Sequence, residues 1–154
     1  MDRHALIEHY RTGYDDVVDA LAGATDNDLD RRPAPDAWTS REIVHHLADS
    51  ETRSYLRIRE IITGDPAVVQ AYAENHWVAA LPTYRLPIAP SLVVLQAVRL
   101  ATEQLIDAMT DADWAKETVH SESGRFSADT WLEWYAKHPH DHADQIRRAR
   151  RGEV

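Results

Sequence analysis

The chain of 154 residues contains no cysteine. This absence excludes a disulfide framework, a thiol nucleophile within the chain, an iron–sulfur cluster and any zinc site built on cysteine. No apolar run approaches the roughly 18 residues that cross a membrane, and the N-terminus lacks the apolar core of a signal peptide. Together with the length, these absences predict a cytoplasmic protein of one domain, residues 1–154.

Positive charge is also scarce, with 17 basic against 26 acidic residues and a formal net charge of −9. Nucleic acids and anionic membrane surfaces attract proteins with a positive face, so we expect neither as a partner. Histidine is plentiful, at nine residues, and supplies the only soft nitrogen ligands of the chain. The arrangement of these histidines is therefore the main clue to function.

Four segments repeat apolar residues at the three- and four-residue spacing of an amphipathic helix. They cover residues 2–22, the stretch from Thr39 to the stop at Gly64-Asp65-Pro66, residues 91–109 and residues 127–151. Thr39 and Glu42 form a capping-box motif, and Ser127 is a suitable N-cap. No segment predicts a β-strand. The fold class expected is all-α, a four-helix bundle with one long connection between helices 2 and 3, residues 66–90.

Helical phase separates the histidines into inward and outward sets, because each residue turns a helix by about 100°. On the fourth helix His138 and His142 share the buried stripe, and His140 lies on the opposite side and is expected to contact solvent. On the second helix His46 lies at the edge of the apolar face, and His45 is expected to point to solvent. His9 on the first helix is likewise expected to be solvated.

Three inward histidines on two neighbouring helices can form a metal site. His46, His138 and His142 would leave coordination positions open to water or substrate, as catalytic rather than structural zinc sites do. The alternative is that they are core histidines hydrogen-bonded to neighbouring side chains. Pro139 lies between the last two ligands and cannot donate to the carbonyl of Tyr135, so a kink or bulge is expected there.

Residues near this site are candidates for lining a substrate pocket. Trp131, Trp134 and Tyr135 adjoin the histidine pair, although aromatic residues at this spacing also form bundle cores. Arg99 lies at the edge of the third helix's apolar face, where anion binding competes with an ordinary ion pair.

The sequence resembles the DinB/YfiT-like superfamily of bacterial four-helix bundles. The matching residues are 38–51 (WTSREIVHHLADSE), then Trp114 with the segment from His120 to Gly124, and finally 138–146 (HPHDHADQI). The resemblance implies a divalent ion, zinc or nickel, held by His46, His138 and His142, and often a homodimer. Characterised members include thiol S-transferases that use bacillithiol or mycothiol, and a mycothiol-dependent maleylpyruvate isomerase.

The predicted function follows from metal chemistry. A three-histidine ion lowers the pKa of a bound water or binds a thiol as its thiolate. An external low-molecular-weight thiol would supply the sulfur that this cysteine-free chain lacks, with Asp49 and Gln145 as helpers that orient ligands or water. We therefore predict a metal-dependent thiol S-transferase acting on a small molecule. The alternatives are a metal-dependent hydrolase and a non-enzymatic, dimeric metal-binding module.

Overall fold

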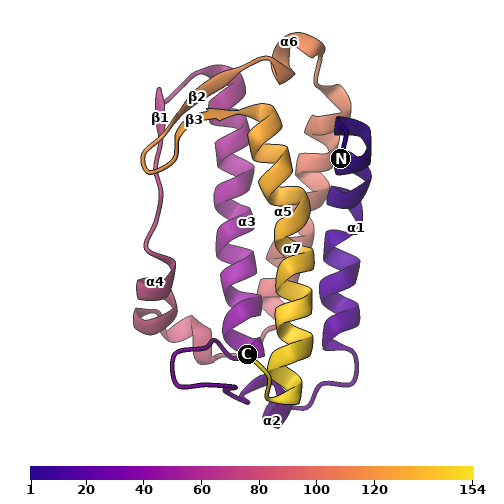
Figure 1. The fold of residues 1–154 in the computed structure, drawn as a ribbon, viewed down its shortest axis with the longest axis vertical. Helices are drawn as coiled ribbons and strands as arrows, with labels where there is room; N and C mark the ends of the chain where they lie inside the picture. The colour runs from indigo at the N-terminus through magenta and orange to yellow at the C-terminus, as the bar shows by residue number, and fades with distance from the viewer.

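The computed structural model describes residues 1–154 and contains four long helices packed side by side (Figure 1). They are α1 (Arg3–Leu21), α3 (Ser40–Thr63), α5 (Ala89–Ala108) and α7 (Ala128–Arg151). Helices α1 and α7 run toward the end of the bundle where the chain terminates, and α3 and α5 run the opposite way. The predicted four-helix bundle is confirmed. Because α3 and α5 are parallel, a long crossover has to connect them.

The helices begin and end where local chemistry indicates. Thr39 accepts a hydrogen bond from the backbone N–H of Glu42, whose carboxylate accepts one from the N–H of Thr39 at 2.8 Å. Gly64 ends α3 in the left-handed conformation, with φ of 72°. Ser127 caps α7 by accepting from the N–H of Thr130. These local signals explain why the predicted helix bounds agree with the structure to within one or two residues.

A small sheet at one end of the bundle corrects the expectation that the chain has no strand. Strands β1 (Val68–Val69), β2 (Glu117–His120) and β3 (Gly124–Ser127) form it in that order. The pair β1–β2 is parallel and β2–β3 is an antiparallel hairpin. Strands of two to four residues are too short for an alternating pattern, and β1 pairs with a segment about fifty residues away. No local signal could have predicted them.

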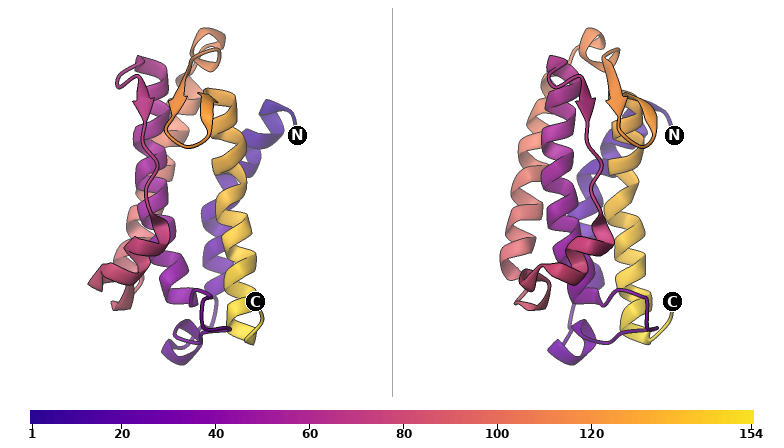
Figure 2. Two further views of the ribbon diagram at one scale, coloured as in Figure 1. Left: turned by 60° about the vertical axis from the view of Figure 1, so that its left-hand side comes forward. Right: turned by 90° about the vertical axis from the view of Figure 1, so that its left-hand side faces the viewer.

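The connection from α3 to α5 contains β1, α4 (Glu74–Ala80) and the 3₁₀ turn η1 (Pro82–Arg85). Between β1 and α4 it is extended and crosses in front of the space between α3 and α7 (Figure 2). Tyr84 fastens it to α3 by donating to Asp49 at 2.8 Å. Two further short helices, α2 (Asp26–Leu29) and α6 (Asp111–Trp114), lie in the other connections. None of the helices is both long enough and apolar enough to span a membrane.

The same connection corrects the expectation that His45 points to solvent. His45 is buried, donates from Nε2 to the carbonyl of Leu86 at 3.0 Å and accepts at Nδ1 from the Ser91 hydroxyl at 2.7 Å. Phase placed it correctly away from the bundle axis. That outer side of α3 is covered by the segment after η1, which the helical pattern cannot show.

The core consists of two apolar clusters with polar residues at the level between them. The cluster near the sheet includes Ile58, Ile61, Phe126, Trp131 and Leu132. The cluster near the chain's C-terminus includes Val17, Ile43, Leu47, Leu95 and Ile146. Along each long helix, the residues between the two clusters are polar or small: Gly13, Ser50, Glu51, Ser54, Arg99, Thr102, His138 and His142. A polar layer therefore crosses the middle of the bundle.

Arg99 is the centre of this polar layer and contacts all three other long helices. Its guanidinium, 1% exposed, donates to Glu51 Oε1 on α3 at 2.8 Å. It also donates to the carbonyl of Tyr135 on α7 at 3.4 Å and to the carbonyl of Tyr10 on α1, and it lies over the Tyr10 ring. One buried cation thus joins α1, α3, α5 and α7.

Pro139 explains why the Tyr135 carbonyl is available to Arg99. Helix α7 continues through Pro139 without a break, and the proline has no N–H to donate four residues back. The freed Tyr135 carbonyl accepts from Arg99 instead. Gly13 permits this approach, because a Cβ there would lie 2.9 Å from Arg99 Nη2 and 3.0 Å from Pro139 Cγ.

We predict that Arg99→Met lowers the free energy of unfolding by about 3–5 kcal/mol, because it leaves the Glu51 carboxylate buried without its partner. The double variant Arg99→Met/Glu51→Met should lose less stability than Arg99→Met alone, since the unpaired charge is gone. Urea unfolding followed by circular dichroism measures both. The exposed Arg125, paired with Glu117, is the control, and Arg125→Met should leave the midpoint unchanged. An equal loss in the single and double variants would contradict this account.

Candidate metal centre

The structure brings His46, His138 and His142 together at the edge of the polar layer. Nε2 of His138 lies 3.3 Å from Nε2 of His46 and 3.1 Å from Nε2 of His142. The ligand atoms of the three residues all lie within 4.8 Å of one another. They are the three residues that helical phase placed inward.

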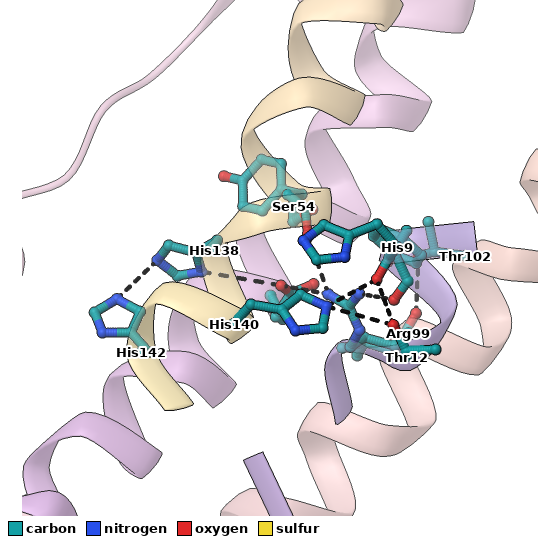
Figure 3. Close-up of polar contacts among 12 residues, drawn as sticks. His9, Thr12, Ser54, Arg99, Thr102, His138, His140 and His142 are labelled. Carbon is teal, nitrogen blue, oxygen red and sulfur yellow. Dashed lines mark hydrogen bonds and ion pairs between the residues drawn. The ribbon is translucent and has the colours of Figure 1, made fainter. Parts of the chain in front are cut away.

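Helix geometry accounts for this convergence. His138 and His142 are four residues apart on α7, so their side chains lie one turn apart on the same face. His46 comes from the facing side of α3, which packs against α7. Figure 3 shows His138 and His142 on one side of α7 and His140 directed to the other side, toward His9 on α1.

His140 and His9 correct the expectation of solvated side chains. Both are partly buried, and their rings stack at a centroid distance of 3.8 Å. Nδ1 of His140 lies 2.7 Å from a carboxylate oxygen of Asp16, and its Nε2 lies 3.0 Å from the His9 carbonyl oxygen. Helical phase correctly placed His140 on the side of α7 opposite to His138 and His142, but α1 packs against that side and covers the ring.

Each candidate ligand has a neighbour at its second ring nitrogen. Nδ1 of His142 donates to Gln145 Oε1 at 2.7 Å, which leaves a lone pair on Nε2 for a metal. The Tyr72 hydroxyl lies 3.4 Å from Nδ1 of His46. Nδ1 of His138 has no hydrogen-bond partner, and Glu51 Oε1 lies 4.0 Å away. Gln145 therefore holds His142 in the tautomer that carries its proton on Nδ1 and can bind a metal through Nε2.

Burial keeps the three imidazoles neutral. Desolvation, with a further contribution from His142, lowers the pKa of His46 to about 3. Desolvation and the neighbouring histidines lower the pKa of His138 well below its usual range. Desolvation also lowers the pKa of His142, although its bond to Gln145 opposes the shift. Neutral imidazole is the form that binds metal, so these residues are prepared to do so at neutral pH.

The donor set fits a divalent ion of the zinc or nickel type. Three neutral imidazole nitrogens directed at one point are the ligands such ions prefer, and three protein ligands leave room for an exogenous one. The unpartnered Nδ1 of His138 supports the same assignment, since a metal on Nε2 would place the proton on Nδ1, facing the Glu51 carboxylate.

A pocket of about 320 Å³ lies beside His138. Four separate parts of the chain form it: α3, the α3–α5 connection, the β2–β3 hairpin and α7. Its lining residues are Ser50, Arg57, Ala71, Tyr72, Glu74, His120, Glu122, Ser123, Trp134, Tyr135 and His138. The connection of residues 66–90 thus forms one wall of this pocket.

The structure separates the four residues predicted to line a substrate pocket. Trp134 and Tyr135 line it. Trp131 does not: it is fully buried in the apolar core, where Nε1 donates to the Ser54 carbonyl at 3.2 Å. Arg99 does not line it either, because Glu51 and two carbonyls enclose its guanidinium. For both residues, phase identified an inward direction but not the depth of burial.

The two predicted helper residues also have different positions. Gln145 contacts a candidate ligand directly, as described above. Asp49 instead accepts from Tyr84 and anchors the α3–α5 connection.

Sequence reasoning missed Glu51, Arg57 and His120. The first two had a usable signal, because Glu51 falls within the apolar face of α3 and Arg57 falls on the same edge as His46. A charged residue in either position indicates a buried partner or a site. His120 begins the segment 120–124 that resembles the family, but its spacing gave it no role, since its position beside the site depends on the hairpin.

A known protein family and several of its named relatives match most of the chain. The model of the DinB superfamily matches residues 9–146. A relative from Geobacillus kaustophilus, named "Putative metal-dependent hydrolase", is 32% identical over 133 residues, which cover 85% of this chain and 74% of the relative. A relative of the same name from Oceanobacillus iheyensis is 34% identical over 77% of this chain and 68% of its own. The chain belongs to the DinB superfamily.

Two solved structures share the fold. YfiT from Bacillus subtilis, described as "a probable metal-dependent hydrolase with an unusual four-helix bundle topology", superposes with a TM-score of 0.88. It is 25% identical, and the match covers 98% of this chain and 89% of YfiT. The mycothiol-dependent maleylpyruvate isomerase has a TM-score of 0.75 at 14% identity, over 95% of this chain and 61% of the isomerase, and this likeness shows the fold alone.

We predict that the protein, loaded with zinc or nickel and desalted, retains about one ion per chain, and that His138→Ala/His142→Ala retains almost none. Elemental analysis by mass spectrometry measures this. His140→Ala is the matched control, because it removes an imidazole from the same turn of α7 that faces away from the site. Equal metal contents in wild type and double variant would refute the site.

We also predict that nickel affinity falls by less than about fourfold between pH 7.5 and pH 6.0, the change expected if a single histidine kept the ordinary pKa of 6.5. Burial lowers the pKa of His46 to about 3, that of His138 well below its usual range, and that of His142 as well, so fewer protons compete with the metal than at three ordinary histidines. Three histidines with the ordinary pKa of 6.5 would instead bind about fiftyfold more weakly at pH 6.0. Competition with a chelator whose own pH dependence is known distinguishes the two results.

Proposed function

We propose that this protein is a divalent-metal-dependent hydrolase of a small molecule, with His46, His138 and His142 as the metal ligands. The observation that carries the proposal is the convergence of three neutral imidazole nitrogens beside a pocket that one of these histidines lines. The names of the relatives from Geobacillus and Oceanobacillus support the same reaction class. A divalent ion in such a site polarises a substrate carbonyl and lowers the pKa of a water or thiol bound to it.

The surrounding residues would hold the site in its working geometry. Gln145 orients His142 through its Nδ1–H, and the Tyr72 hydroxyl lies against His46. Tyr135 and Trp134 form an aromatic wall that excludes water from one side of the bound molecule. The Glu51 carboxylate, held by Arg99, faces the remaining nitrogen of His138. The polar layer would thereby fix the orientation of the His138 ring as a metal ligand.

A second candidate, the thiol S-transferase, is favoured by a second pocket, which borders the centre at His142. It has a volume of about 480 Å³ and is lined by Trp38, His142 and Gln145 among others. A transferase needs space for two organic molecules next to the metal, whereas a hydrolase needs space for one. An external thiol in one pocket and its acceptor in the other would use both. The homodimer and the cytoplasmic location stay predictions.

Metal-loaded protein should hydrolyse at least one member of a panel of small amides, esters and lactones. The rate should fall by at least a hundredfold in His138→Ala/His142→Ala and remain unchanged in His140→Ala. The panel is then repeated with bacillithiol, mycothiol or coenzyme A and a chlorobimane acceptor, following the loss of thiol.

Each result supports one of the candidate functions. Hydrolysis without thiol supports the hydrolase, and thiol consumption above the metal-free control supports the transferase. If neither reaction exceeds the double variant over the whole panel, the enzymatic proposal fails and the metal-binding module is left.

A further inference from the structure

Arg57 stands apart from the other buried arginines. Arg41 pairs with Asp26 and Asp30, and Arg99 pairs with Glu51, but Arg57, at 7% exposed, has no carboxylate within 4.0 Å. Its Nη1 donates to the Tyr135 hydroxyl at 2.6 Å and its Nη2 to the Gln70 carbonyl at 2.9 Å. Both acceptors are neutral, and Nε has no partner. A buried cation without an ion pair is costly, and only the longer-range attraction of the Glu74 carboxylate offsets that cost within the chain. Arg57 can therefore accept a further negative charge from a molecule in the pocket.

His120 places a second donor in the same pocket. The backbone N–H groups of Glu122 and Ser123 both donate to Nδ1 of His120 at 3.3 Å, which assigns the proton to Nε2. Burial and the nearby Arg57 lower the pKa of His120, so the ring is neutral. Nε2–H has no partner within the chain, and His120 lines the pocket together with Arg57 and His138. The hairpin turn thus holds an imidazole donor in a fixed orientation.

We propose that Arg57 and His120 form an anion subsite that binds the carboxylate of a small monocarboxylate, with the rest of the molecule extending toward His138. The missing counter-ion of Arg57 is then supplied by the ligand. Tyr135 connects the two ends of the pocket, since its hydroxyl accepts from Arg57 and its ring lies 6.0 Å from that of His138. The volume of about 320 Å³ suits a small molecule.

The charges around the pocket favour a single negative charge over two. Arg57 is the only cation among the lining residues, and His120 is neutral. The exposed carboxylates of Glu74 and Glu122 also line the pocket and repel a second anionic group. Dicarboxylates and inorganic phosphate should therefore bind more weakly than a monocarboxylate of similar size.

The identity of this anion as part of the substrate rests on the proposed function, but its binding needs no metal and can be tested alone. Benzoate is a suitable probe, because Trp134 and Tyr135 line the pocket, and benzamide is its neutral analogue. Calorimetric titration of metal-free and zinc-loaded protein compares them. We expect benzoate to bind both forms at least tenfold more tightly than benzamide, terephthalate or phosphate.

Substitutions identify the groups responsible. Arg57→Gln should weaken benzoate binding at least tenfold without lowering the metal content, because Arg57 donates to Tyr135 and Gln70 and to none of the three candidate ligands. Arg57→Lys, which keeps the charge, should lose less. His120→Asn should weaken binding severalfold, because it keeps an acceptor near the Nδ1 position and removes the Nε2 donor. Arg59→Gln, on the same helix and stacked on Tyr55, is the matched control and should bind as wild type.

The subsite and the proposed function can fail separately. Benzoate that binds Arg57→Gln as tightly as wild type refutes the subsite. Benzoate that binds only the zinc-loaded protein also refutes it, since the anion then sits on the metal. Benzoate binding to metal-free protein that depends on Arg57 supports the subsite even if no hydrolysis is found. Hydrolysis by a protein that does not bind benzoate supports the proposed function and contradicts the subsite.

Discussion

The buried ion pair of Arg99 and Glu51 is the interaction on which the rest of the structure depends. It joins all four long helices at the level where the apolar core is interrupted. Burying this pair costs desolvation free energy. The cost is offset because the other three helices supply hydrogen-bond acceptors for Arg99: a carboxylate from α3 and carbonyls from α1 and α7. Pro139 contributes by what it lacks, since its missing N–H frees the Tyr135 carbonyl. The pair therefore defines how the helices are aligned along one another.

This alignment also places the candidate metal centre. His138 precedes Pro139 on α7, and Glu51 follows His46 by five residues on α3, so the ion pair and the three imidazoles share one polar layer. The carboxylate that balances Arg99 also faces the free nitrogen of His138. A structural charge pair and a metal-binding group are thus coupled through Glu51. Arg57, six residues further along α3, forms no ion pair within the chain.

The bundle and the three converging histidines could be anticipated because both follow from periodicity. Capping residues Thr39 and Ser127 identify the helix starts, and a turn of 100° per residue places His46, His138 and His142 inward. The same reasoning failed for His45 and His140, which point away from the axis and are nevertheless covered. Phase specifies a direction relative to one helix, whereas burial depends on which other segments lie across that direction.

The sequence by itself determined the number and bounds of the long helices and their inward faces, since these follow from capping residues and from periodicity within each helix. Its motifs also indicated the family to which the chain belongs. Tertiary structure alone decided the pocket. Two of its walls come from the α3–α5 connection and the β2–β3 hairpin, which are held together where β1 pairs with β2 across about fifty residues. Only that assembly shows that Arg99 forms an ion pair and Arg57 forms none, because the partner of a buried charge is chosen by distance in space.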